Sequence, residues 1–229
     1  MTATSRRACR FARGWVPAPG LTSRWVWPVR SWSWRCAATR ALVVGTFVFQ
    51  LVVILALQAR DTYWGDSWMV SDFVDKAMSG GVESLFRGPY HTLFYDARLY
   101  FSCYPFQATF FWLLYGLRLV FGEFSFMVFQ VLSALSTSLG VWALLSLTES
   151  LTPSAGARRV AWVLVALCLP MYWLSTFLYG NALGCGLALA FLAMQARAMG
   201  CGGRAAAAWC AGSLVPLAAA LCVKATFVL

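Results

Sequence analysis

Four carboxylates gathered within fifteen positions are the residues of this chain best suited to do chemistry. Asp61, Asp66, Asp72 and Asp75 are half of the eight acidic residues, and they directly follow a long apolar run. A carboxylate held beside a hydroxyl group can accept its proton and so act as a general base. A carboxylate is a candidate for this role if its position is not already accounted for by the polar face of a helix.

Asp72 and Asp75 fit the wet face of an amphipathic helix over 68–79. They fall on one helix face with Lys76, and Asp72 and Lys76 form a favourable i, i+4 pair. The apolar residues recur at the spacing of another face; they are Val70, Phe73, Val74, Ala77 and Met78. The pattern predicts a helix that lies along the membrane and ends at Gly80-Gly81.

Asp66 precedes this predicted helix and lies between Trp64 and Trp68, aromatic residues of the kind found at membrane interfaces. One explanation is structural, because Asp is favoured as a helix N-cap, where its charge complements the helix dipole. The other is catalytic. The two roles are compatible, since a cap also holds the carboxylate in place, and the residues alone leave both open.

Further polar groups follow between residues 87 and 105. His91 is the single histidine, in the loop "GPYHTLFYD", where an ordinary polar contact is the simpler interpretation. Tyr100 and Tyr104 come just before Pro105, which the first turn of a helix tolerates. The eight cysteines contain no CxxC pair and no metal-like cluster, so neither a metal site nor a disulfide framework is predicted. These residues require no cofactor, and a divalent cation is left open.

The elements that must position these groups are membrane helices. The chain is 61% hydrophobic and only 11% charged, which predicts an all-α polytopic membrane protein. Its net charge of +10 does not indicate nucleic-acid binding, because eight of the eighteen basic residues are arginines in positions 1–40. That segment is predicted to be a disordered cytoplasmic tail that contacts anionic lipids.

The first apolar run, 41–59, has about the length of a transmembrane helix. It is long for a signal peptide and lacks a good cleavage site, so we interpret it as a retained anchor. Further apolar runs lie at 105–121, 124–147, 160–178, 182–198 and 206–229. The last run ends the chain without a polar tail, from which we expect a truncated protein.

The topology depends on whether 105–121 crosses the membrane. If it does, four arginines emerge on the outer face, against the positive-inside rule; they are Arg158, Arg159, Arg197 and Arg204. If 105–121 lies along the outer interface, all four fall inside with the N-terminal tail. The sequence therefore predicts five spans, a cytoplasmic N-terminus, and a large outer loop over 60–123 that carries amphipathic interface helices.

The order of these features resembles the N-terminal part of a GT-C superfamily glycosyltransferase. It is similar to bacterial members of the dolichyl-phosphate-mannose-protein mannosyltransferase and aminoarabinose transferase group. The likeness covers residues 41–229 and rests on motif order. "YWGD" opens the outer loop, and "YFSCYP", an interface helix ending in "FGE", a span and an Arg pair follow. The resemblance implies an integral protein of the bacterial plasma membrane.

Such enzymes move a sugar from a polyprenyl-phosphate donor to an acceptor at the outer face, with inversion. Their essential acid lies in the first outer loop, and Asp66 is the matching position. The resemblance implies further substrate contacts, and the candidates are His91, Arg98, Tyr100, Tyr104 and Lys224. The chain departs from the group at "YPFQ", where relatives have a Lys-Pro-Pro-type element, and at Asn181, where an acid is common. It also lacks the later spans that usually complete the donor site.

Two other classes of function compete with this interpretation. One is a non-catalytic membrane component, such as a transporter subunit or an assembly partner, and the other is an inert truncated product. A transporter should carry ionisable residues deep within its spans. The apolar runs between residues 124 and 222 carry almost none, which favours a site at the membrane interface.

Overall fold

The computed structural model describes residues 37–57, 66–87, 96–152 and 154–223. This part of the chain is helical and contains no strand, which confirms the predicted all-α class. The α-helices are α2 (Ala37–Leu57), α3 (Asp66–Gly80), α4 (Ala97–Cys103), α5 (Phe106–Phe121), α6 (Ser125–Leu151), α7 (Ala155–Ala166), α8 (Leu169–Trp173), α9 (Gly180–Met199) and α10 (Gly203–Val223). Three 3₁₀ turns accompany them: η2 (Val82–Phe86), η3 (Gly122–Phe124) and η4 (Leu174–Thr176).

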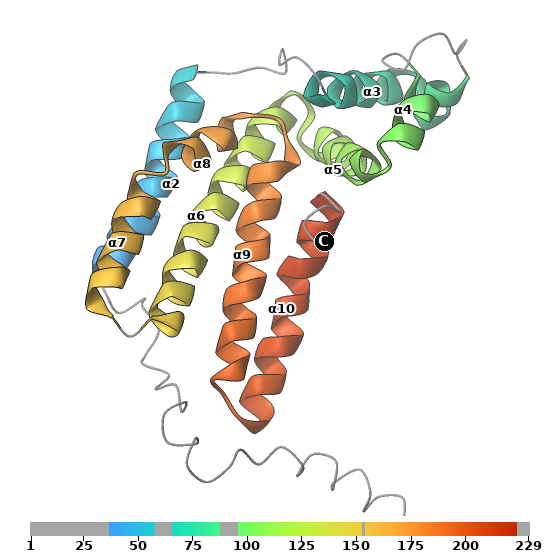
Figure 1. Ribbon diagram of the computed structural model, residues 1–229. Helices are drawn as coiled ribbons and strands as arrows, with labels where there is room; N and C mark the ends of the chain where they lie inside the picture. The colour runs from blue at the N-terminus through green and yellow to red at the C-terminus, as the bar shows by residue number, and fades with distance from the viewer. Residues whose placement is uncertain (1–36, 58–65, 88–95, 153, 224–229) are drawn as a thin grey trace, which may run out of the picture.

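The helices divide into a bundle and a layer that lies across one end of it (Figure 1). The bundle contains α2, α6, α7, α9 and α10, which run up and down beside one another. The layer contains α3, η2, α4 and α5, and these short elements all come from the segment between the first two spans. We refer to this group as the end layer. Figure 1 thus separates the membrane-crossing elements from the segment that carries most of the candidate site residues.

The number of spans agrees with the sequence prediction. By length and composition, the described residues contain four helical stretches that could cross a membrane, or five if α7 and α8 form one span bent by 44°. One stretch, Phe106–Leu151, is 46 residues long. At 1.5 Å per residue it would measure about 70 Å, more than twice the hydrocarbon thickness of a bilayer. It must therefore contain a turn.

Gly122 makes that turn. Its φ of 54° lies in the left-handed region, which a right-handed helix cannot continue and which glycine adopts without strain. The chain changes direction there, so that α5 belongs to the end layer while α6 runs through the bundle (Figure 1). The apolar run 105–121 is thus an end-layer helix, as predicted, and α6 provides the second span.

The arginines of the bundle gather at the end opposite the end layer. Arg158 and Arg159 lie at the start of α7, Arg197 in the last turn of α9, and Arg204 at the start of α10. These helix ends all lie away from α3, α4 and α5 (Figure 1). The bundle therefore has one basic end, the arrangement expected if 105–121 does not cross the membrane.

The tightest helix contact in the bundle is between α6 and α9. A Cβ placed on Gly186 would overlap the backbone carbonyl of Ser136, and one placed on Gly140 would approach the Gly186 Cα to 3.0 Å. The Ser136 hydroxyl donates a hydrogen bond of 2.6 Å to the Leu183 carbonyl across the same contact. Small residues allow this approach, as is common where helices pack within membranes.

A buried amide joins the first span to the second. Gln50 of α2 is fully buried, and its Nε2 donates to the Thr46 carbonyl at 3.1 Å and to Ser138 Oγ of α6 at 3.4 Å. Hydrogen bonds of this kind hold helices together in a medium that offers no water. Gln50 was not among the predicted functional or packing residues, although an amide in the middle of an apolar run was a visible signal.

Candidate functional site

Helix α3 has the two-faced character that its sequence predicted. Val70, Phe73, Val74 and Ala77 are buried, and Lys76 pairs with Asp72 at 2.6 Å. Gly81 follows with a positive φ of 77°, which ends the helix at the predicted place. The apolar face packs against α5 and η2 of the same chain, so α3 is bound to the rest of the end layer through its own hydrophobic side.

The prediction of the apolar face is wrong at one residue. Met78 is 40% exposed, while Met69 is 3% exposed and takes its place. Met69 and Met78 are nine residues apart, so they lie at opposite edges of the face that Val70, Phe73 and Ala77 form. The buried face is therefore rotated about the helix axis, toward Met69 and away from Met78, relative to the predicted face.

Asp66 is the first residue of α3, two positions earlier than the predicted start. It precedes Val70 by four residues and Phe73 by seven, the spacing of one helix face. The register therefore puts position 66 at the head of the stripe that packs into the end layer. The preceding residues, among them Asp61 and Trp64, lie outside the described residues, as does any N-cap.

Arg118 near the end of α5 ties α3 to the turn between α5 and α6. Its Nη2 lies 3.0 Å from Asp75 Oδ1 and 3.9 Å from Glu123 Oε1. Its Nη1 donates to the Gly122 carbonyl and to Ser125 Oγ, each at 3.4 Å. Asp75 was interpreted only as part of a wet face, and the structure adds a specific partner. Sequence spacing could not reveal that partner, because the two residues are 43 positions apart.

We expect Arg118→Gln to loosen α3 without unfolding the bundle. Removing a partly screened ion pair costs about 1 kcal/mol, so amide hydrogens in α3 should exchange roughly fivefold faster. Hydrogen exchange measured by mass spectrometry tests this. Asp72→Asn is the matched control, because it breaks a pair internal to α3 and should change exchange less than twofold. Equal exchange in the Arg118 variant and the wild type would show that the pair does not hold α3.

The two candidate tyrosines form the aromatic centre of the end layer. Tyr100 of α4 is fully buried, with its ring centroid 5.5 Å from that of Phe73 and 5.2 Å from that of Tyr104. Asp96 starts this helix as an N-cap, its Oδ1 accepting from the Arg98 and Leu99 backbone N–H groups at 2.8 and 3.3 Å. Tyr100 therefore packs α4 against α3, and Tyr104 is the half-buried member of the pair.

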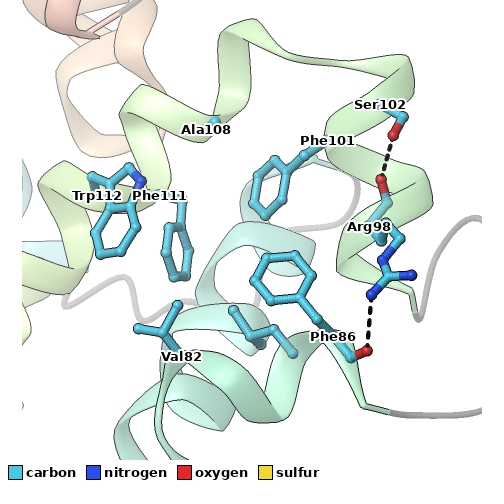
Figure 2. Close-up of a pocket in the computed structure, with 9 residues that line it drawn as sticks. Val82, Phe86, Arg98, Phe101, Ser102, Ala108, Phe111 and Trp112 are labelled. Atoms are coloured by element: carbon cyan, nitrogen blue, oxygen red, sulfur yellow. Dashed lines mark hydrogen bonds between the residues drawn. The ribbon is translucent and has the colours of Figure 1, made fainter.

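A cavity of about 290 Å³ lies between η2, α4 and α5. Its wall is mainly apolar and aromatic, formed by Val82, Leu85, Phe86, Phe101, Phe111 and Trp112. Ala108, Ser102 and Arg98 complete it. Figure 2 shows Arg98 on one side, with its Nη2 donating to the Phe86 carbonyl at 3.3 Å, and the Trp112 indole on the other. Arg98 was among the predicted site residues, whereas the cavity was not predicted.

The structure brings some of the predicted site residues together and separates others. Arg98, Tyr100 and Tyr104 all lie in or just after α4, and the Tyr100 ring contacts Phe73 near the middle of α3. Asp66 begins α3, seven residues before Phe73, which is a rise of about 10 Å along the helix. The remaining candidates, His91 and Lys224, lie outside the described residues.

Comparison with known proteins gives no relative. No family model, no curated protein and no solved structure matches the chain. Within the described ranges, no group of three or more His, Cys, Asp or Glu side chains is arranged to hold a metal ion. The class that fold and composition define is therefore an integral membrane protein of helical type with a helical layer at one end of its bundle.

Proposed function

We propose that this protein is a membrane glycosyltransferase that moves a sugar from a polyprenyl-phosphate donor to an acceptor at the membrane face covered by the end layer. The observation that carries the proposal is the position of Asp66. It is the first residue of α3, the first helix after the first span, and the register of that helix places position 66 in line with Val70 and Phe73. This is where the GT-C resemblance expects the essential acid.

In the proposed reaction, Asp66 accepts the proton of the acceptor hydroxyl as its oxygen attacks the anomeric carbon. The new C–O bond forms as the bond from the sugar to the lipid phosphate breaks, and the phosphate leaves with the electron pair. A single displacement inverts the anomeric carbon. The leaving phosphate needs cationic or hydrogen-bonding partners, for which His91 and Lys224 are the candidates.

Arg98 is less suited to the leaving phosphate. It borders the cavity and donates to the Phe86 carbonyl of η2, the turn that follows the C-terminal end of α3, while Asp66 is the first residue of that helix. A general base and the leaving group must both lie within a few ångströms of the reacting carbon. Tyr100 is a packing residue by its burial, and Tyr104 supports the same aromatic cluster.

A transfer assay tests the proposal directly. Membranes that contain the protein should transfer labelled sugar from polyprenyl-phosphate mannose or polyprenyl-phosphate aminoarabinose to an acceptor. The rate should exceed that of membranes without the protein and should depend on Asp66. Absence of transfer from both donors, with the protein inserted and folded, would count against the proposed function.

The proposed orientation places the basic end of the bundle in the cytoplasm, in accordance with the positive-inside rule. Cys201 lies between α9 and α10 at that end, and exposed Cys103 ends α4 in the end layer. In intact bacterial cells, an impermeant maleimide should label a variant that retains only Cys103. It should leave a variant that retains only Cys201 unlabelled until the membrane is opened. The reverse pattern would invert the orientation.

A further inference from the structure

The cavity in the end layer has the size and lining of a site for a single apolar chain. Its volume of about 290 Å³ lies at the lower edge of the roughly 300–1,000 Å³ typical of small-molecule sites. Phe101 and Phe111 supply aromatic walls, and the Phe86 ring faces them across the space (Figure 2). A space of this size takes a segment of a hydrocarbon chain, while the rest of an amphiphile remains outside.

The rim of the cavity has two kinds of surface. Trp112 is 54% exposed and Phe86 is 38% exposed, so apolar area continues outward from the cavity. Arg98 adds an exposed guanidinium, whose planar arrangement of N–H donors matches phosphate oxygens. An apolar space with a cation at its edge is complementary to a lipid chain that carries an anionic phosphate.

The position of the cavity in the fold agrees with that chemistry. The end layer lies across one end of the bundle of candidate spans (Figure 1). If these spans fill the hydrocarbon core, a layer at their end falls where head groups meet hydrocarbon. Tryptophan is enriched at this depth, and arginine there gains from anionic lipid. A phospholipid standing beside the bundle can therefore place a chain in the cavity and its phosphate near Arg98.

We propose that the cavity between η2, α4 and α5 is a binding site for one acyl chain of an anionic phospholipid, with the head-group phosphate on Arg98. The site is separate from the proposed reaction centre, because Asp66 lies at the other end of α3. The bound lipid comes from the surrounding membrane. The inference does not rest on glycosyl transfer and holds for any function of this chain.

Native mass spectrometry of the whole purified protein, titrated with phosphatidylglycerol, measures this binding. Arg98→Gln should weaken it about five- to tenfold, since one cation at a membrane surface is worth about 1 kcal/mol. Ala108→Leu should weaken it by roughly tenfold or more, because the larger side chain occupies the cavity. Arg87→Gln is the control. Arg87 forms a solvent-exposed ion pair with Glu83 and does not line the cavity. The affinity of this variant for phosphatidylglycerol should therefore stay within twofold of wild type.

Replacing the titrant identifies the occupant. Phosphatidylcholine should bind the wild type more weakly than phosphatidylglycerol does, and the difference should vanish in Arg98→Gln. Unchanged phosphatidylglycerol affinity in both Arg98→Gln and Ala108→Leu would overturn the proposal. It would also be overturned if polyprenyl phosphate alone responded to these two variants, because the cavity would then belong to the sugar donor. Circular dichroism of each variant establishes that the helices are intact.

Discussion

Replacing Asp66 with Asn is expected to lower the rate of sugar transfer by roughly 10²–10⁴-fold, the usual contribution of a general base. The amide has nearly the same size and shape as the carboxylate but cannot take the acceptor proton. Initial rates measured at saturating donor and acceptor would show the loss in kcat. Binding of the donor should change little, because the proposed role of Asp66 is to accept a proton during attack.

The same substitution should leave the protein folded. Asp66 is the first residue of α3, where a negative charge stabilises a helix by about 0.3–1 kcal/mol through the dipole. Asn is also well tolerated at a helix N-terminus. Amounts of membrane-inserted protein should therefore match the wild type, which separates loss of chemistry from loss of structure.

Asp72→Asn provides the matched comparison for catalysis. Asp72 lies in the same helix, is partly exposed and pairs with Lys76, so transfer should stay near the wild-type rate. Near-normal turnover in Asp66→Asn would show that Asp66 is not the general base and only contributes a charge at the helix terminus. An equal loss in the two variants would mean that the base had been assigned to the wrong carboxylate.

Local patterns in the sequence predicted the elements of the end layer well. The spacing of Val70, Phe73, Val74 and Ala77 is set within one helix of fifteen residues. It can be recognised without knowing which elements the helix packs against. The same holds for the Asp72–Lys76 pair and for the glycines that end α3. Met78 was misassigned because periodicity gives the approximate direction of a face but not which residues at its two edges the neighbouring elements cover.

Features built from distant segments could not be predicted in this way. Asp75 meets Arg118 because α5 packs against α3, and no spacing encodes that contact. The cavity likewise needs three elements to be placed before its walls meet. Arg98 was chosen from the resemblance as a phosphate partner, and only the three-dimensional arrangement separates it from Asp66.

The spans were predicted from apolar length and arginine position, two signals that the bilayer imposes directly. The packing between the spans was not. The sequence "GNALGCG" at 180–186 contains glycines at close spacing, yet it does not reveal which of them meets another helix. The structure distinguishes them, since Gly186 lies against the backbone of α6 and Gly140 opposes it.

This distinction predicts a graded series of glycine-to-alanine variants. Alanine adds a single methyl group and favours helix by about 1 kcal/mol over glycine. Gly45 of α2 has no neighbouring atom within 4 Å of the position that an added methyl group would take, so Gly45→Ala should be neutral or slightly stabilising. In Gly140→Ala the methyl group would meet the Gly186 Cα at 3.0 Å, which predicts a moderate loss of stability.

Gly186→Ala should give the largest loss of the series, a net fall in unfolding free energy of about 2 kcal/mol or more. Its methyl group would overlap the Ser136 carbonyl, a backbone group that cannot rotate away as a side chain can. The two helices must separate instead, which also stretches the hydrogen bond from Ser136 to Leu183. Unfolding in mixed detergent micelles, followed by circular dichroism, orders the three variants. If Gly186→Ala proved as stable as Gly45→Ala, α6 and α9 would not be in contact at this point.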